Sequence, residues 1–199
     1  MSTAIPELYR HDHIEARKKV MKLFGGAFHL RATDGTLLAY SKMKAFKLKE
    51  DIRVFADEAM THELLNIQAN KVIDFSASYN VRDSQTGEHL GSLRRKGWSS
   101  LFRDSWEILD PDGVVRGRVI EDSGWKAFAR RMNEIVAFLL PQTFLVQVND
   151  QTVATMKQNI QLFAAKFQID LSHDAEGVLP RPLAIATVIL LLAVEGRQG

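Results

Sequence analysis

The chain has 199 residues, of which 46% are hydrophobic and 25% are charged, a composition typical of globular proteins. Its 26 lysines and arginines nearly balance 24 aspartates and glutamates, which argues against a strongly electrostatic nucleic-acid-binding protein. Cysteine is absent, which excludes disulfides, a thiol nucleophile and cysteine-ligated metal sites, and suits a cytoplasmic protein.

The N-terminal segment lacks the apolar stretch of a secretory signal. It contains the sequence His11-Asp12-His13, which has no second ligand cluster to complete a metal site. A basic run follows, made of Arg17, Lys18, Lys19 and Lys22. We expect this run to be a solvated face, and residues 1–19 to be a peripheral segment.

Three later stretches resemble one another, at residues 28–57, 79–110 and 144–171. Each has an alternating apolar segment, a polar turn, a second segment with a small residue (Ala39, Gly91 or Ala154), and a third segment. Such alternation between Gly- and Asp-containing turns is typical of β-meanders. Further strand candidates lie at residues 64–69, 72–76 and 114–120, so we expect about ten to twelve strands in all.

Two segments have helical or uniformly apolar patterns. Residues 125–140 carry apolar side chains at helical spacing before Pro141, which predicts a surface helix. Residues 183–194 are apolar and are bracketed by Arg181 and Glu195. As a helix this run spans about 18 Å, against about 30 Å of membrane hydrocarbon, so it predicts a buried core helix and not a transmembrane segment.

A closed barrel of about twelve strands is too wide to be filled by its own side chains. A helix that is apolar on all sides must be buried in a core or in a membrane. Placing the C-terminal helix inside the barrel satisfies both conditions. The sequence therefore predicts a mainly β fold in a single domain, residues 1–199, with a closed antiparallel barrel around a central hydrophobic C-terminal helix.

Two parts of the chain carry a resemblance to a known family. Residues 81–112, with the segments Leu90-Gly91-x-Leu93-Arg94-Arg95-Lys96 and Trp106-Glu107-Ile108-Leu109-Asp110, resemble the LURP-one-related and phospholipid-scramblase-like proteins. The end of the chain, through Ser172-x-Asp174 and residues 182–194, also resembles that family, and the similarity covers residues 20–195. The resemblance implies the Tubby C-terminal-like fold, a twelve-stranded barrel around a buried helix. It implies no catalytic residue set; it implies binding of anionic phospholipid or phosphoinositide headgroups, lipid scrambling, or protein-interaction and defence roles.

Basic residues beside aromatic ones form the candidate lipid-binding surface. They are Arg94, Arg95, Lys96, Trp98 and Arg103 in the second unit, and Lys42, Lys44 and Lys47 in the first. An anionic membrane surface attracts such clusters by about 1 kcal/mol per base, with the aromatic residue at the interface. The alternative is structural, because outward lysines on strands prevent aggregation and arginine stems cover apolar surface.

Other polar patterns do not predict a catalytic or metal site. The segment Asp170-x-Ser172-x-Asp174-x-Glu176 begins like a calcium loop, but Gly177 and Arg181 fall at the wrong positions, so we expect a turn that leads into the helix. The histidines are scattered, and no nucleophile elbow or phosphate-binding glycine loop occurs. We expect no enzymatic activity, cofactor or metal.

The leading hypothesis is a non-enzymatic binding module, cytoplasmic or peripheral at a membrane, that engages anionic headgroups or a protein partner through its basic outer face. No nucleic-acid partner is expected. The alternatives are a protein-interaction scaffold without a lipid role, a scramblase-like protein anchored by residues 183–194, and a barrel enzyme or carrier with an open interior.

Overall fold

The computed structural model describes residues 5–21, 25–43, 51–70, 78–95, 106–122, 142–161 and 164–194. A short 3-10 helix, η1 (Glu7–Arg10), comes first, and helix α3 (Arg181–Val194) comes last. Between them lie twelve strands: β1 (His13–Met21), β2 (Gly25–Ala32), β3 (Leu37–Met43), β4 (Asp51–Phe55), β5 (Glu63–Ala69), β6 (Ser78–Asp83), β7 (His89–Arg95), β8 (Trp106–Leu109), β9 (Val115–Glu121), β10 (Thr143–Val148), β11 (Gln151–Gln161) and β12 (Ala164–Asp170).

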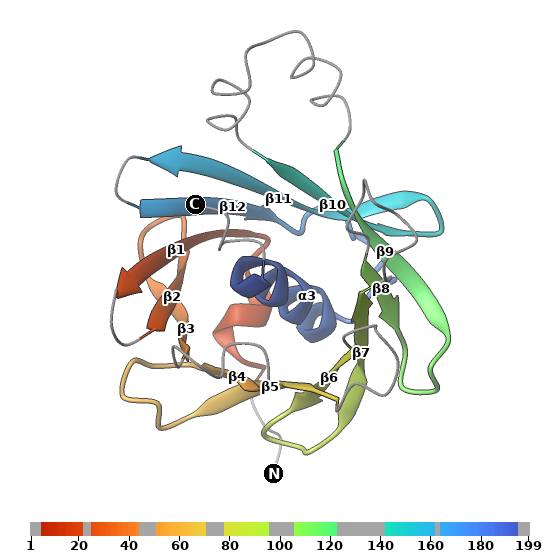
Figure 1. Ribbon diagram of the computed structural model, residues 1–199, viewed down its shortest axis with the longest axis horizontal. Helices are drawn as coiled ribbons and strands as arrows, with labels where there is room; N and C mark the ends of the chain where they lie inside the picture. The colour runs from red at the N-terminus through yellow and green to blue at the C-terminus, as the bar shows by residue number, and fades with distance from the viewer. Residues whose placement is uncertain are drawn as a thin grey trace, which may run out of the picture.

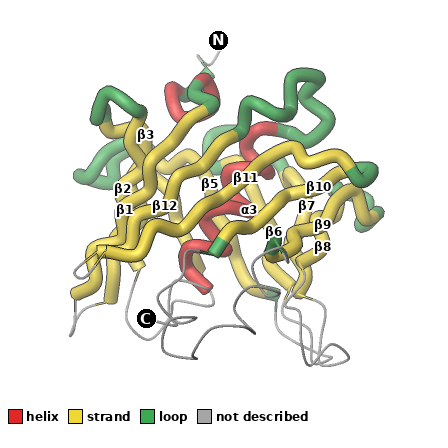
Figure 2. The backbone as a smooth tube through the Cα atoms, turned by 90° about the horizontal axis from the view of Figure 1, so that it is seen from above, coloured by secondary structure: helices red, strands yellow, loops and turns green. Residues whose placement is uncertain are grey.

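The strands form a closed antiparallel barrel (Figure 1). Each strand pairs with its neighbours in the sequence, and β12 closes the barrel against β1, from His13 opposite Asp170 to Lys18 opposite Ala165. The predicted mainly β fold and closed barrel are therefore confirmed. Figure 2 shows the described turns at one end of the barrel, together with the N-terminal segment.

The three similar stretches of the sequence occupy equivalent positions in three hairpins. In each hairpin the small residue lies directly opposite the last apolar residue before a register shift. These pairs are Ala39 with Leu30, Gly91 with Val81, and Ala154 with Val146. A bulge at this point increases the local twist of the hairpin, which helps a sheet to curve into a barrel.

Helix α3 lies along the centre of the barrel (Figures 1 and 2). Every residue from Leu183 to Ala193 has at most 5% of its surface exposed. The polar member of this run, Thr187, donates its hydroxyl to the Leu183 carbonyl at 2.8 Å. The strands supply apolar side chains at alternate positions, as in the burial pattern of β10. The C-terminal run is thus the core of the barrel, as predicted.

The expectation that residues 1–19 are peripheral is wrong for the part that is described. Strand β1 pairs with both β2 and β12 and so completes the barrel. In η1, Leu8 is 0% exposed and belongs to the hydrophobic core. The charged residues of β1 concealed its short alternation of Ile14 and Ala16. Residues 72–76 and 125–140, predicted as a strand and a surface helix, lie outside the described residues.

Candidate binding surfaces

Because α3 occupies the centre of the barrel, the candidate binding surfaces lie on the outside and at the ends of the barrel. Residues Leu183–Ala193 are buried on all sides of the helix, so the inner faces of the strands are used for packing. An open lumen for a substrate or carried ligand, one of the alternatives, does not fit this packing.

The predicted basic residues that the structure describes are Arg94, Arg95 and Lys42. Arg94 donates from Nε and Nη2 to Oε2 of Glu107, at 3.0 and 2.6 Å. Lys42 is exposed near the end of β3, which three strands separate from β7 in the barrel. Lys44, Lys47, Lys96, Trp98 and Arg103 lie outside the described residues. The described members therefore do not form one continuous patch.

Arg95 lies on the opposite face of β7 from Arg94, because neighbouring side chains of a strand alternate in direction. It pairs in register with buried Trp106, and its guanidinium carbon is 6.0 Å from the centre of the Trp106 ring. The rings of Trp106 and Tyr79 have their centroids 5.9 Å apart. Arg95 therefore belongs to an inner aromatic contact, and Arg94 alone of the two faces outward.

Sequence reasoning did not identify a groove on the outer side of β8, β9 and β10. This outer groove has a volume of about 440 Å³ and is lined in part by Glu107, Arg116, Arg118, Gln147, Asn149 and Asp150. A volume of this size lies within the range of roughly 300–1,000 Å³ that small-molecule sites occupy. The outer groove is larger than a second pocket of about 340 Å³ beside the start of α3, and we take it as the concave candidate site.

The arginines of the outer groove are held by carboxylates. Arg118 donates from Nη2 to Asp150 at 2.6 Å and from Nε to the Gln147 side chain at 3.3 Å. Arg116 donates from Nε to Asp110 at 2.7 Å. Backbone N–H donation from Val114 and the neighbouring Arg116 keep the pKa of Asp110 below its usual value, so this carboxylate stays charged.

Cross-strand register connects the outer groove to Arg94. Arg94 lies opposite Glu107, Glu107 opposite Arg118, and Arg118 opposite Gln147. These four side chains form one row across β7 to β10 on the outer face, because residues paired directly in a sheet point to the same side. Along this row the side chains are in turn positive, negative, positive and neutral.

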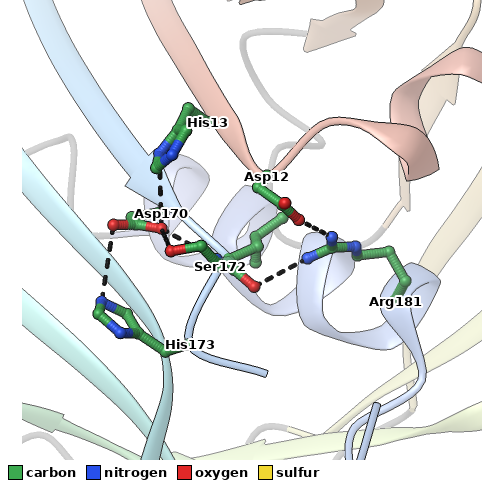
Figure 3. Close-up of polar contacts among 7 residues, drawn as sticks. Asp12, His13, Asp170, Ser172, His173 and Arg181 are labelled. Carbon is green, nitrogen blue, oxygen red and sulfur yellow. Dashed lines mark hydrogen bonds and ion pairs between the residues drawn. The ribbon is translucent and has the colours of Figure 1, made fainter. Parts of the chain in front are cut away.

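A second polar group lies where the chain enters α3 (Figure 3). We call it the helix-entry cluster; its members are Asp12, His13, Asp170, Ser172, His173 and Arg181. Arg181 donates to Asp12 and, at 3.1 Å, to the Leu171 carbonyl, which ties the start of α3 to the start of β1. His13 and His173 approach different oxygens of Asp170, at 3.5 and 3.6 Å.

The helix-entry cluster has the contacts of a structural turn. Partial burial alone would raise the pKa of Asp170, but hydrogen bonds from the Ser172 hydroxyl and backbone, with the two nearby imidazoles, lower it overall. Asp174 accepts the backbone N–H groups of Val178 and Leu179 at 2.8 and 3.1 Å. The segment that begins like a calcium loop therefore forms a turn that leads into the helix.

The side chains of the helix-entry cluster are not arranged for hydrolysis or for metal binding. The Ser172 hydroxyl donates to Asp170 at 2.6 Å, so its proton is directed to a carboxylate and not to a histidine base. The histidines lie on opposite sides of Asp170 in Figure 3, and within the described ranges no three His, Cys, Asp or Glu side chains converge as metal ligands.

Comparisons with known proteins identify a family for this chain. The model of the family described as LURP-one-related matches residues 37–191. The X-ray structure of a protein from Arabidopsis thaliana is 15% identical, with a TM-score of 0.48, over 93% of this chain and 92% of that one. No curated protein sequence matches. Among the described helices, none has the length and apolar character needed to cross a membrane.

Proposed function

The chain belongs to the LURP-one-related family, and we propose that it is a non-enzymatic binding module for the anionic headgroups of phospholipids or phosphoinositides. The proposed surface is the outer face of β7, β8 and β9. The observation that supports it is that Arg94, Arg116 and Arg118 share this face, while α3 occupies the centre of the barrel (Figure 1). Planar guanidinium groups match phosphate oxygens in a bidentate arrangement.

The ion pairs on this face determine how strongly headgroup binding should depend on salt. The Arg118–Asp150 pair is exposed on both sides, and such pairs contribute only about 0–1 kcal/mol, so a headgroup phosphate can compete for the Arg118 guanidinium. Since carboxylates compensate much of the positive charge, long-range attraction is weaker than the arginines alone would give. We therefore expect binding through short-range contacts, with a shallower dependence on salt than a polybasic segment shows.

Membrane contact from the surface fits the structure better than anchoring by the helix. An anchored, scramblase-like protein needs residues 183–194 in the lipid, yet these residues pack inside the barrel. Withdrawal of α3 would expose the inner faces of the strands, at a cost of about 1.5–3 kcal/mol for each large apolar side chain. We accordingly propose a cytoplasmic protein that is peripheral at the membrane.

Vesicle co-sedimentation tests the proposal. We expect binding to phosphatidylcholine vesicles that contain phosphatidylserine or a phosphoinositide, and little binding to phosphatidylcholine alone. The double variant Arg94→Glu/Arg118→Glu should lose this binding. The matched control is Arg53→Glu, because Arg53 on β4 is exposed and also pairs with carboxylates, those of Asp51 and Glu63. Absence of binding at low salt would overturn the lipid role and leave the protein-interaction scaffold.

A further inference from the structure

We propose that the outer groove is a binding site for a phosphate monoester, and that Asp150 occupies its phosphate position in the unliganded protein. Binding then exchanges the Asp150 carboxylate for the phosphate on Arg118. That the phosphate belongs to a lipid headgroup rests on the proposed function. Within the outer face of β7, β8 and β9, the inference names one site. Soluble phosphate compounds carry the same chemistry and are distinguished by the experiment below.

The two arginines of β9 supply the donors. Arg116 and Arg118 are two residues apart on one strand, so they share a face with their Cα atoms about 7 Å apart. Asp110 engages only Nε of Arg116, and no described residue accepts from its Nη groups. Because Asp110 is itself held by the backbone of its turn, it positions this guanidinium beside the groove.

Asp150 is placed so that a bound phosphate can replace its carboxylate on Arg118. Its side chain is 85% exposed, and its contact with Arg118 is 2.6 Å long. It belongs to the Asn149-Asp150 turn between β10 and β11, where both residues have positive φ, 50° and 62°. A carboxylate on guanidinium is the protein's own analogue of a bound phosphate, and an exposed turn side chain can rotate away at little cost.

The acidic side chain on the groove wall does not prevent anion binding. Glu107 is only 13% exposed, and both donors of Arg94 that reach it share its Oε2. Its charge is therefore compensated by Arg94. Gln147 accepts from Nε of Arg118 and holds the guanidinium plane in one orientation. Asp150 is consequently the carboxylate whose removal should improve binding of an anion.

The test is an NMR titration with glycerol phosphate, a soluble phosphate monoester. Asp150→Asn should tighten binding by about two- to fivefold, since it removes a competing charge worth one exposed ion pair. Asparagine also tolerates positive φ, so the turn should be retained. Arg118→Gln should weaken binding by about tenfold or more, because it removes a charged donor.

Matched controls separate the exchange from a general charge effect. Asp112→Asn removes an exposed carboxylate from the neighbouring turn, and Arg53→Gln removes a paired arginine from β4. Both should bind glycerol phosphate as the wild type does. If Asp150→Asn leaves the affinity unchanged or weakens it, or if Arg118→Gln has no effect, the inference is overturned.

A second arm uses vesicles that contain phosphatidic acid, whose headgroup is a phosphate monoester. Tighter vesicle binding by Asp150→Asn would support a lipid source. If glycerol phosphate responds as expected but vesicles do not bind, the proposed membrane function fails and the groove remains a site for a soluble phosphate compound. If all variants bind vesicles equally and glycerol phosphate shows no difference between them, the groove inference fails and lipid binding does not use Arg118.

Discussion

The inner and outer faces of the barrel wall carry different kinds of side chain. On the inner side, strand residues such as Val81 and Leu93 belong to the same hydrophobic core as α3, which is buried on its whole circumference from Leu183 to Ala193. On the outer side, charged residues meet as exposed ion pairs, for example Arg118 with Asp150. A change on the inner side alters packing that has no substitute, whereas a change on the outer side replaces contacts that water can also make.

This difference separates stability from recognition. Truncating a buried leucine or isoleucine costs about 2–5 kcal/mol, whereas breaking an exposed ion pair costs about 0–1 kcal/mol. The outer surface can therefore acquire a ligand site without loss of the fold. We expect variants of the inner side to abolish or weaken folding, and variants of the outer side to change binding with little effect on folding.

The largest effect should come from removal of the helix. A chain that ends after Leu179 lacks α3 and leaves the inner faces of the strands unpacked. The lost apolar burial exceeds the total stability of about 5–15 kcal/mol, so we expect no cooperative thermal transition in circular dichroism. Leu190→Met, which conserves volume, is the control and should keep a cooperative transition at a cost below about 1.5 kcal/mol. A truncated chain that melts cooperatively would contradict the core role of α3.

A smaller but still large effect should follow Gly91→Ala. The added Cβ would lie 2.3 Å from the Leu109 carbonyl oxygen and 3.1 Å from Cδ2 of Leu183 in α3, at a φ of +146°. Strain and overpacking together should cost about 3 kcal/mol in urea unfolding. Gly87→Ala is the comparison, because Gly87 also has positive φ but has nothing within 4 Å of the added atom. Equal losses for the two variants would show that close packing at Gly91 does not matter.

The inner side of the barrel was largely predictable from the sequence, for a physical reason. Burial dictates where apolar residues stand in the sequence. A strand with one buried face alternates apolar and polar residues, and a helix buried on all sides is apolar throughout. The alternation in the three similar stretches and the apolar run of 183–194 therefore predicted the strands and the central helix. Strand β1 was missed because its outward positions are charged and its described buried residues are only Ile14 and Ala16. A strand with so few apolar positions resembles a solvated segment.

The outer groove was not predictable, because it depends on pairing between distant residues. Arg118 and Asp150 are 32 residues apart in the sequence, and they meet through the register of β9 with β10 and the turn that follows. The predicted surface was chosen from bases that cluster in the sequence beside aromatic residues. In the structure, two adjacent members of that cluster, Arg94 and Arg95, lie on opposite faces of β7.

An orphan hydroxyl on the inner side gives a smaller effect of opposite sign. The Oγ of Ser41 on β3 is buried and has no hydrogen-bond partner among the described residues, so the lost hydration of this hydroxyl is not compensated. Ser41→Ala should therefore raise the free energy of unfolding by about 1 kcal/mol in urea titration. In contrast, Ser92→Ala should lower it by about 1 kcal/mol, because the half-buried Ser92 hydroxyl donates to Asn80 at 2.9 Å. A loss of stability in Ser41→Ala would show that this hydroxyl has a favourable contact.

The smallest effect should be the acid response of the helix-entry cluster. The folded state lowers the pKa of Asp170, so at pH near 4 the unfolded chain binds more protons at this residue than the folded protein does. The stabilisation is present above the ordinary aspartate pKa of about 3.9 and is lost as pH falls through the lowered value. Asp170→Asn should therefore reduce the fall in melting temperature between about pH 5 and pH 2. Asp112→Asn, which removes an exposed carboxylate from the turn between β8 and β9, is the control, and identical slopes for the wild type and Asp170→Asn would contradict the assignment.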